Sequence, residues 1–209
     1  MGRCLALLGA VVLGCAVAAT AGAGQKRPDQ HVTIFADSSG AALGWDSTAK
    51  RIVEHGNRVR FELHPCGRLV QPGCITPAPP SVLLLVRELG HRVGPTAVVF
   101  VGYNDDPARY RNGIPTVLRA MRNHGVKHVV WLTLRAISKQ YVDINHAIYA
   151  AAQKWPLMTV LDWNHYAAPH ASWFSGDGIH MNGVGAVAYA TYLHRSLKKL
   201  GLTGPAPAG

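Results

Sequence analysis

Short runs of apolar residues recur along the chain and predict buried β-strands. β-Branched residues dominate these runs, and such residues favour the pleated, half-buried surface of a sheet. The run TAVVFVG is apolar throughout, which is typical of a strand buried on both faces. Strands are predicted over residues 31–36, 58–63, 96–102, 127–134 and 157–163.

The segments between these runs place apolar residues three and four positions apart, which predicts amphipathic helices. Such helices are expected over residues 40–55, 79–92, 107–123, 141–154 and 183–200. Strands that alternate with helices favour a parallel sheet covered on both faces. The sequence therefore predicts a three-layer α/β/α domain with a mostly parallel five-stranded sheet.

The two ends of the chain differ from this middle part. Arg3 precedes an almost unbroken apolar stretch over residues 4–18, and small residues with A-x-A spacing follow it. This pattern is typical of a secretory signal peptide, and the stretch is shorter than the roughly 20 residues of a membrane span. We expect a signal peptide over 1–23, a short linker over 24–30, one domain over 31–200 and a disordered tail over 201–209.

A lipoprotein signal, with Cys15 as the lipidated residue, is the alternative interpretation of the N-terminus. With either signal, the protein is expected to be secreted or associated with the cell envelope. The formal net charge is +10, and removal of the signal takes away one arginine, which leaves +9. A basic exported protein is attracted to anionic envelope surfaces or polymers. The basic residues form no aromatic-interleaved cluster, so we expect no nucleic-acid partner, and we expect a monomer.

Cys66 and Cys74 are the two cysteines that remain after the predicted signal, and they lie in the segment CGRLVQPGC. An even pair that closes a short loop in an exported protein predicts a disulfide. The alternative is a metal site that adds His64, but zinc sites usually need four ligands at tighter spacings. We therefore predict a disulfide, no metal and no other cofactor.

Three polar segments are expected at one edge of the sheet. Ser38 follows the first predicted strand, Asn104 follows the third, and Asp177 and His180 precede the last helix. A serine needs a base to act as a nucleophile, a histidine can be that base, and an aspartate can orient the histidine. An asparagine amide can stabilise a developing oxyanion. Each residue alone is also explained by a helix cap or a turn, but the combination predicts a serine hydrolase site.

The order and spacing of these segments resemble the SGNH, or GDSL-type, hydrolases. The family blocks G-D-S, G-x-N-D and D-x-x-H correspond to Ala36-Asp37-Ser38, Gly102-Tyr103-Asn104-Asp105 and Asp177-Gly178-Ile179-His180. The resemblance covers about residues 31–200 and is closest to small exported actinobacterial members. It implies the flavodoxin-like SGNH fold. One position departs from the pattern, since Ala36 stands where the family has glycine.

The resemblance also implies a role for each matched residue. Ser38 would be the nucleophile, His180 its base and Asp177 the group that orients the base. The oxyanion hole would combine the Ser38 backbone N–H, the Asn104 amide and a glycine N–H after the second strand. Gly67 is the first choice for that glycine, and Gly73 is the rival.

Tyr103 and Trp163 are two further candidates, either as residues that line the substrate pocket or as core residues. The predicted function is hydrolysis of a small acyl ester, or of an acylated glycan or lipid, through an acyl-enzyme. Two alternatives remain open at this point. The same site would serve acyl transfer to a surface glycan, or the domain would bind ligands without catalysis.

Overall fold

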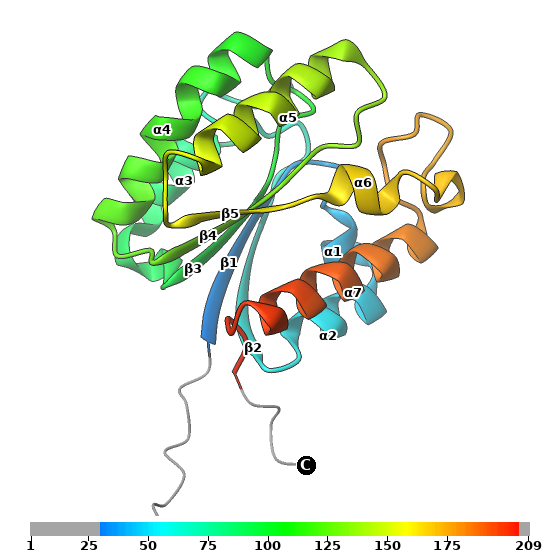
Figure 1. The fold of residues 1–209 in the computed structure, drawn as a ribbon, viewed down its shortest axis with the longest axis horizontal. Coiled ribbons are helices and arrows are strands. Elements are labelled where there is room, and N and C mark those ends of the chain that lie inside the picture. Colours follow the sequence, from blue (N-terminus) through cyan, green and yellow to red (C-terminus); the bar gives the residue numbers. More distant parts are fainter. Residues whose placement is uncertain (1–29, 205–209) are drawn as a thin grey trace, which may run out of the picture.

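The computed structural model describes residues 30–204 (Figure 1). The predicted signal peptide, nearly all of the predicted linker and residues 205–209 lie outside the described residues. Within the described part, five strands form one sheet in the order β2-β1-β3-β4-β5, and each neighbouring pair is parallel. The strands are β1 (Gln30–Ala36), β2 (Asn57–Leu63), β3 (Thr96–Phe100), β4 (His128–Leu132) and β5 (Met158–Leu161).

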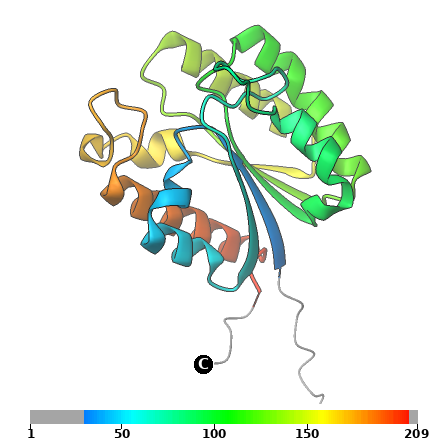
Figure 2. The ribbon, with the colours of Figure 1, turned by 180° about the vertical axis from the view of Figure 1, so that it is seen from behind.

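Helices cover both faces of this sheet, which confirms the predicted three-layer architecture. Figures 1 and 2 show α1, α2 and α7 on one face and α3, α4 and α5 on the other. The longer helices are α2 (Ser47–Glu54), α3 (Val82–Leu89), α4 (Pro107–Asn123), α5 (Lys139–Ala152) and α7 (Gly183–Lys199). The shorter ones are α1 (Ala42–Trp45), α6 (Trp163–Ala167) and the 3-10 turns η1 (Gly90–Val93) and η2 (Ala171–Trp173).

The helix predicted over residues 40–55 is in fact two helices, α1 and α2. Asp46 lies between them with extended backbone, and its carboxylate accepts hydrogen bonds from the N–H groups of Thr48 and Ala49. A capping aspartate satisfies donors that have no partner at a helix start. The apolar spacing continues across this break, so periodicity alone predicted one helix.

The residues just outside the longer helices position the site. Asp106 caps α4 by accepting from the Arg109 N–H, and Pro107 occupies the first turn, where its missing N–H costs nothing. Asn182 caps α7 by accepting from the Gly185 N–H. These caps begin the two helices directly after the segments that hold Asn104 and His180.

The core lies on the central strands, where β3 is buried along its whole length. Strand β2 is at the sheet edge and is only partly covered, which explains its alternating charged and apolar residues. The first residues of the predicted tail contact the domain: Leu202 is 6% exposed, and the Gly204 N–H donates to Gly56 O at 2.7 Å. Among the helices that the structure describes, none combines the length and apolarity needed to span a bilayer.

Candidate active site

The candidate site lies where the direction of the strand connections reverses. Strand β1 lies between β2 and β3. The chain passes from β1 to β2 on one side of β1, and then crosses to β3 on the other side. In doubly wound sheets, a crevice opens at this point beyond the carboxyl ends of the strands. Ser38 follows β1 and Asn104 follows β3, so their positions in the chain place them at this edge of the sheet.

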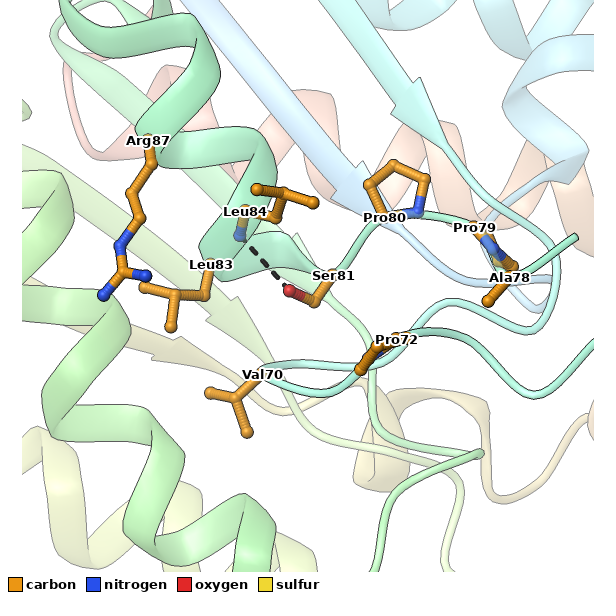
Figure 3. A pocket seen from close by; sticks show the side chains of 9 residues that line it. All are labelled: Val70, Pro72, Ala78, Pro79, Pro80, Ser81, Leu83, Leu84 and Arg87. Atoms are coloured by element: carbon orange, nitrogen blue, oxygen red, sulfur yellow. Dashed lines mark hydrogen bonds between the residues drawn. The ribbon is translucent and has the colours of Figure 1, made fainter.

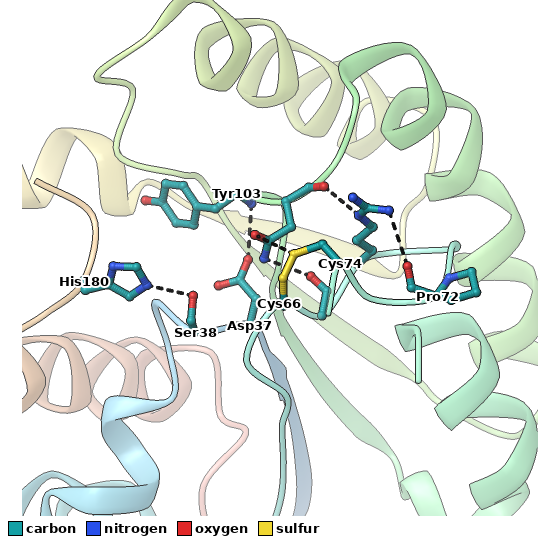
Figure 4. The surroundings of a disulfide bond; sticks show 10 residues. Asp37, Ser38, Cys66, Pro72, Cys74, Tyr103 and His180 are labelled. Carbon is teal, nitrogen blue, oxygen red and sulfur yellow. Dashed lines mark hydrogen bonds between the residues drawn. A yellow bond between two sulfur atoms is a disulfide. The ribbon is translucent and has the colours of Figure 1, made fainter. Parts of the chain in front are cut away.

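Ser38, His180 and Asp177 form one chain of hydrogen bonds, part of which is visible in Figure 4. His180 Nε2 lies 2.8 Å from Ser38 Oγ, and His180 Nδ1 lies 2.5 Å from Asp177 Oδ2. Because an ionised carboxylate can only accept, Nδ1 carries the proton and donates a hydrogen bond to Asp177. Nε2 is then an acceptor, and the Ser38 hydroxyl donates to it.

Asp177 is ionised over the neutral pH range. The hydrogen bond from His180 lowers the pKa of Asp177 to about 2, and the Ile179 backbone N–H is the next contributor. An ionised carboxylate in this position holds the imidazole orientation and stabilises its protonated form. The arrangement can therefore remove a proton from Ser38 and hold it on His180.

A short loop, residues 174–182, brings Asp177 and His180 into this geometry. The Ser175 N–H donates to His180 O at 2.8 Å, and Asp177 Oδ1 accepts from the His180 N–H at 3.0 Å. Gly178 between them has φ +71°, a conformation that disfavours residues with a Cβ. The loop thus turns tightly enough for one side chain to meet another three residues away.

Arg135 supports the same loop from the segment that follows β4. Its Nη1 donates to Gly178 O at 2.6 Å, and its guanidinium carbon lies 4.4 Å from the centre of the Phe174 ring, a cation–π contact. Arg135 belongs to no motif, so the sequence pattern did not predict its role. Its place directly after the fourth predicted strand was the one available signal.

Asp37 is a second residue whose structural role the sequence analysis missed. It is fully buried, and its carboxylate accepts from the Ser39 hydroxyl at 2.6 Å and from the N–H groups of Ser39, Gly102 and Tyr103. Burial raises the pKa of Asp37, while these hydrogen bonds stabilise the ionised form and oppose the rise. Asp37 ties the turn after β1 to the turn after β3. The Ser39 hydroxyl donates to Asp37, whereas the Ser38 hydroxyl is hydrogen-bonded to His180.

Asn104 is held beside the turn that follows β2. Its Nδ2 donates to Gly67 O at 3.2 Å, and its own backbone O accepts from Arg68 Nε at 2.8 Å. Gly102, two residues earlier, has φ +153°, and a Cβ there would lie 2.9 Å from Leu134 Cδ1. An amide nitrogen carries two protons, so Asn104 keeps one N–H beyond the bond to Gly67.

Asp105 anchors the other end of the loop that contains Gly67. Its two oxygens lie 3.2 and 3.1 Å from the Leu69 N–H, which donates to them. Burial raises the pKa of Asp105 to about 7, an effect that the Leu69 N–H opposes. The loop is therefore tied to the site through both Asn104 and Asp105.

The assignment of a glycine N–H to the oxyanion hole does not fit the structure at either glycine. The Gly67 N–H donates to His64 O at 2.8 Å and closes a turn. The Gly73 N–H donates to Pro79 O at 2.9 Å. Both donors already have backbone acceptors, because each glycine lies inside a local turn that motif comparison does not reveal.

Tyr103 and Trp163 are core residues and do not line an open pocket. Trp163 is fully buried, and its ring stacks on Trp173 at a centroid distance of 6.1 Å. Tyr103 is 8% exposed, and its hydroxyl accepts from the Arg135 N–H at 2.7 Å. Both side chains follow strand ends, as pocket residues do, but they turn inward.

Ala36 causes no backbone strain at the position where the family has glycine. Among residues 30–204, Cys66 is the one non-glycine residue with positive φ, so Ala36 has the ordinary backbone of a strand end. The close contact is at Gly40 instead, where a Cβ would lie 2.6 Å from the Ala36 Cβ. The departure from the motif therefore leaves the turn that holds Ser38 intact.

The predicted disulfide between Cys66 and Cys74 is present, with the two Cα atoms 5.3 Å apart (Figure 4). These cysteines are bonded to each other and are not metal ligands. Within the described residues, no three His, Cys, Asp or Glu side chains gather as a metal site requires. The site is built from a hydroxyl, an imidazole, a carboxylate and amide groups.

A groove of about 370 Å³ lies between the loop that contains Cys74 and the start of α3 (Figure 3). Its walls are mostly apolar, and Figure 3 shows Arg87 at one end and Ala78 at the other. Neither Ser38 nor His180 lines this groove. The hollow is therefore separate from the hydrogen-bonded chain described above.

No protein-family model matches the chain, and no curated protein sequence matches it. Solved structures with the same fold do exist. TesA superposes with a TM-score of 0.64 and 17% identity, over 82% of this chain and 99% of that chain.

Two further similar structures are esterases by name. The psychrotrophic esterase EstA from Pseudoalteromonas sp., inhibited by monoethylphosphonate, has a TM-score of 0.60 and 10% identity, over 82% of this chain and 98% of that chain. A carbohydrate esterase of family 3 from Talaromyces cellulolyticus has a TM-score of 0.55 and 14% identity, over 81% of this chain and 97% of that chain. At these identities the likeness establishes a shared fold that spans nearly the whole length of each relative.

Proposed function

We propose that the protein is an exported serine esterase of the SGNH type, which cleaves acyl esters through an acyl-enzyme intermediate. The observation that carries the proposal is the hydrogen-bonded chain from Ser38 through His180 to Asp177 at the carboxyl edge of the sheet. The fold, which the chain shares with solved esterases, supports the same function.

In the first half of the reaction, Ser38 Oγ attacks the ester carbonyl carbon while its proton moves to His180 Nε2. Asp177 stabilises the resulting imidazolium because its carboxylate accepts from Nδ1. Negative charge develops on the carbonyl oxygen, where the Ser38 backbone N–H and the second N–H of Asn104 donate to it. The intermediate then collapses, and the leaving alcohol takes the proton from Nε2.

In the second half, water takes the place of the alcohol. His180 accepts a proton from the water as the water oxygen attacks the acyl carbon of the Ser38 ester. The collapse of this second intermediate returns the proton to Ser38 Oγ and releases the carboxylic acid. No cofactor takes part in either half.

The proposed substrates are small acyl esters, or acylated glycans or lipids of the cell envelope. The formal net charge of +9 on the chain without its predicted signal supports an anionic surface as the place of action. Acyl transfer to a glycan hydroxyl would use the same atoms and would differ only in the group that accepts the acyl chain. Product analysis with and without a glycan acceptor separates these two reactions.

The test uses the chain without its predicted signal and a series of p-nitrophenyl esters of increasing acyl length. Hydrolysis should require Ser38, and an organophosphonate probe should label that residue. Peptide mapping of the adduct identifies the labelled serine. Ser38→Ala should abolish labelling, whereas Ser39→Ala should leave the adduct on Ser38, because the Ser39 hydroxyl is committed to Asp37.

An adduct on Ser39 or on another serine would overturn the assignment of the nucleophile even if esters were hydrolysed. A protein that is neither labelled nor active at any pH would support the alternative of a binding domain without catalysis.

A further inference from the structure

The loop between β2 and α3 contains an unusual backbone conformation beside the candidate site. Residues 64–67 form a turn that the Gly67 N–H closes on His64 O at 2.8 Å. Pro65 and Cys66 are its central residues, and Cys66 has φ +62°. Proline followed by a residue with positive φ is the pattern of a type II turn, whose third position ordinarily takes glycine. A cysteine there is a rare choice that needs an explanation.

Hydrogen bonds tie this turn to the two segments that carry Ser38 and Asn104. The His64 N–H continues the sheet ladder by donating to Ala36 O at 2.9 Å, and Ala36 is two residues before Ser38. On the other side, Gly67 O accepts from the Asn104 amide at 3.2 Å. The turn is therefore bonded both to the strand that leads to Ser38 and to Asn104.

Several backbone N–H groups at this edge have no acceptor among the described residues, those of Ser38, Cys66 and Asn104 among them. Cys66 directly precedes Gly67, whose own N–H closes the turn. A serine hydrolase needs such open donors around the carbonyl oxygen of its substrate. The Cys66 N–H is thus available for the role that Gly67 cannot fill.

The disulfide links this donor to the Asn104 side chain. It joins Cys66 to Cys74, and the Cys74 N–H donates to Cys66 O at 3.1 Å. The Cys74 sulfur also lies 3.6 Å from Asn104 Oδ1. A disulfide sulfur carries no proton, so this is a packing contact on the amide. One cross-link therefore restrains both the Cys66 backbone and the Asn104 side chain.

We propose that Cys66 supplies the third oxyanion donor through its backbone N–H, and that the Cys66–Cys74 disulfide positions this donor together with Asn104. The proposal rests on the esterase function proposed above. The disulfide holds a non-glycine residue in a left-handed conformation that glycine adopts readily. The disulfide then helps to complete the oxyanion hole as well as closing a loop.

Two variants that both lack the disulfide provide the test. Cys74→Ser leaves Cys66 as a non-glycine residue without its cross-link, so kcat should fall by about tenfold to a hundredfold with little change in KM. The double variant Cys66→Gly/Cys74→Ser should recover most of the lost kcat, because glycine adopts positive φ without help. Both are assayed as the chain without its signal, well below their melting temperatures.

Reduction of the unmodified protein is a second measurement of the same effect. A dithiol reductant breaks the S–S bond, leaves two thiols and is itself oxidised to a disulfide. Activity should fall on reduction, with an unchanged KM, and should return on reoxidation. The activity of Cys66→Gly/Cys74→Ser should not respond to the reductant, which controls for other effects of the reagent.

The outcomes separate this role from a purely structural one. A folded Cys74→Ser variant with the kcat of the unmodified protein would overturn the proposal, and so would a double variant as slow as Cys74→Ser. An unmodified protein without Ser38-dependent hydrolysis would overturn the proposed function and this role with it. Hydrolysis that persists unchanged in Cys74→Ser would overturn this role alone.

Discussion

The two loops that complete the site are held in place by different kinds of interaction. The loop of residues 64–74, on the oxyanion side, is closed by a disulfide and anchored by the carboxylate of Asp105. The loop of residues 174–182, on the base side, is held by backbone hydrogen bonds and by Arg135. The first loop thus has a covalent cross-link, whereas the contacts described for the second loop are all non-covalent.

The largest effect is expected where the two sides meet, at Ser38 and His180. Either Ser38→Ala or His180→Ala should lower kcat by about 10⁴-fold or more, because the nucleophile and its base act as one unit. The double variant should be little worse than either single variant. Steady-state kinetics of the three variants check this, and multiplied effects in the double variant would contradict a shared role.

On the oxyanion side, Asn104→Ala should lower kcat by about 10²–10³-fold with little change in KM, since the donor acts mainly in the transition state. Asn112→Ala, at an exposed position on α4, is the matched control and should be neutral. Kinetics of both variants, with circular dichroism to check folding, decide the matter. An unchanged kcat in Asn104→Ala would remove this residue from the oxyanion hole.

On the base side, Arg135→Met should lower kcat by about tenfold to a hundredfold, because the loop that positions His180 loses a hydrogen bond and a cation–π contact. Arg135→Lys should recover part of the loss through its retained charge. Steady-state kinetics of the two variants, with circular dichroism to check folding, measure the effect.

Arg119→Met on the surface of α4 is the control for the loss of one positive charge, and its kcat should match that of the unmodified protein. If a folded Arg135→Met variant kept the original kcat, the loop would be held without Arg135.

The last prediction concerns the free energy of unfolding and its dependence on pH. It involves Asp105, whose carboxylate accepts from the Leu69 N–H. Burial raises the pKa of Asp105 to about 7 in the folded protein, above the value of about 3.9 of an unfolded chain. The folded state thus binds the proton more tightly, so this contribution to stability is present below about pH 4 and is lost as pH rises through about 7.

Asp105→Asn keeps an oxygen that can accept from the Leu69 N–H and removes the titration. Relative to this variant, the unmodified protein should lose stability as pH rises from about 4 to about 7, by a few kcal/mol at most. Urea unfolding at several pH values measures the difference. A difference between the two proteins that is independent of pH would show that Asp105 does not titrate in this range.

The fold could be predicted because each element buries one face and that burial appears in the spacing of apolar residues. The run 96–102 predicted a central strand, and β3 is that strand. The elements that were missed or merged are short: α6 has five residues, and α1 has four and ends at a capping aspartate. Elements of this length contain too few turns for a periodic pattern to become visible.

The sequence alone determined the residue types and order of the chemistry: a serine, an asparagine and an aspartate–histidine pair, each next to a predicted strand or helix end. Parallel strands place such residues at one edge, so their convergence follows from the order of elements. Tertiary structure decided which backbone donors remain open and which side chains turn inward. The Gly67 N–H donates within a turn, the Cys66 N–H has no acceptor among the described residues, and the Trp163 side chain is buried. These outcomes depend on hydrogen bonds and packing between residues distant in sequence or inside local turns, which no motif specifies.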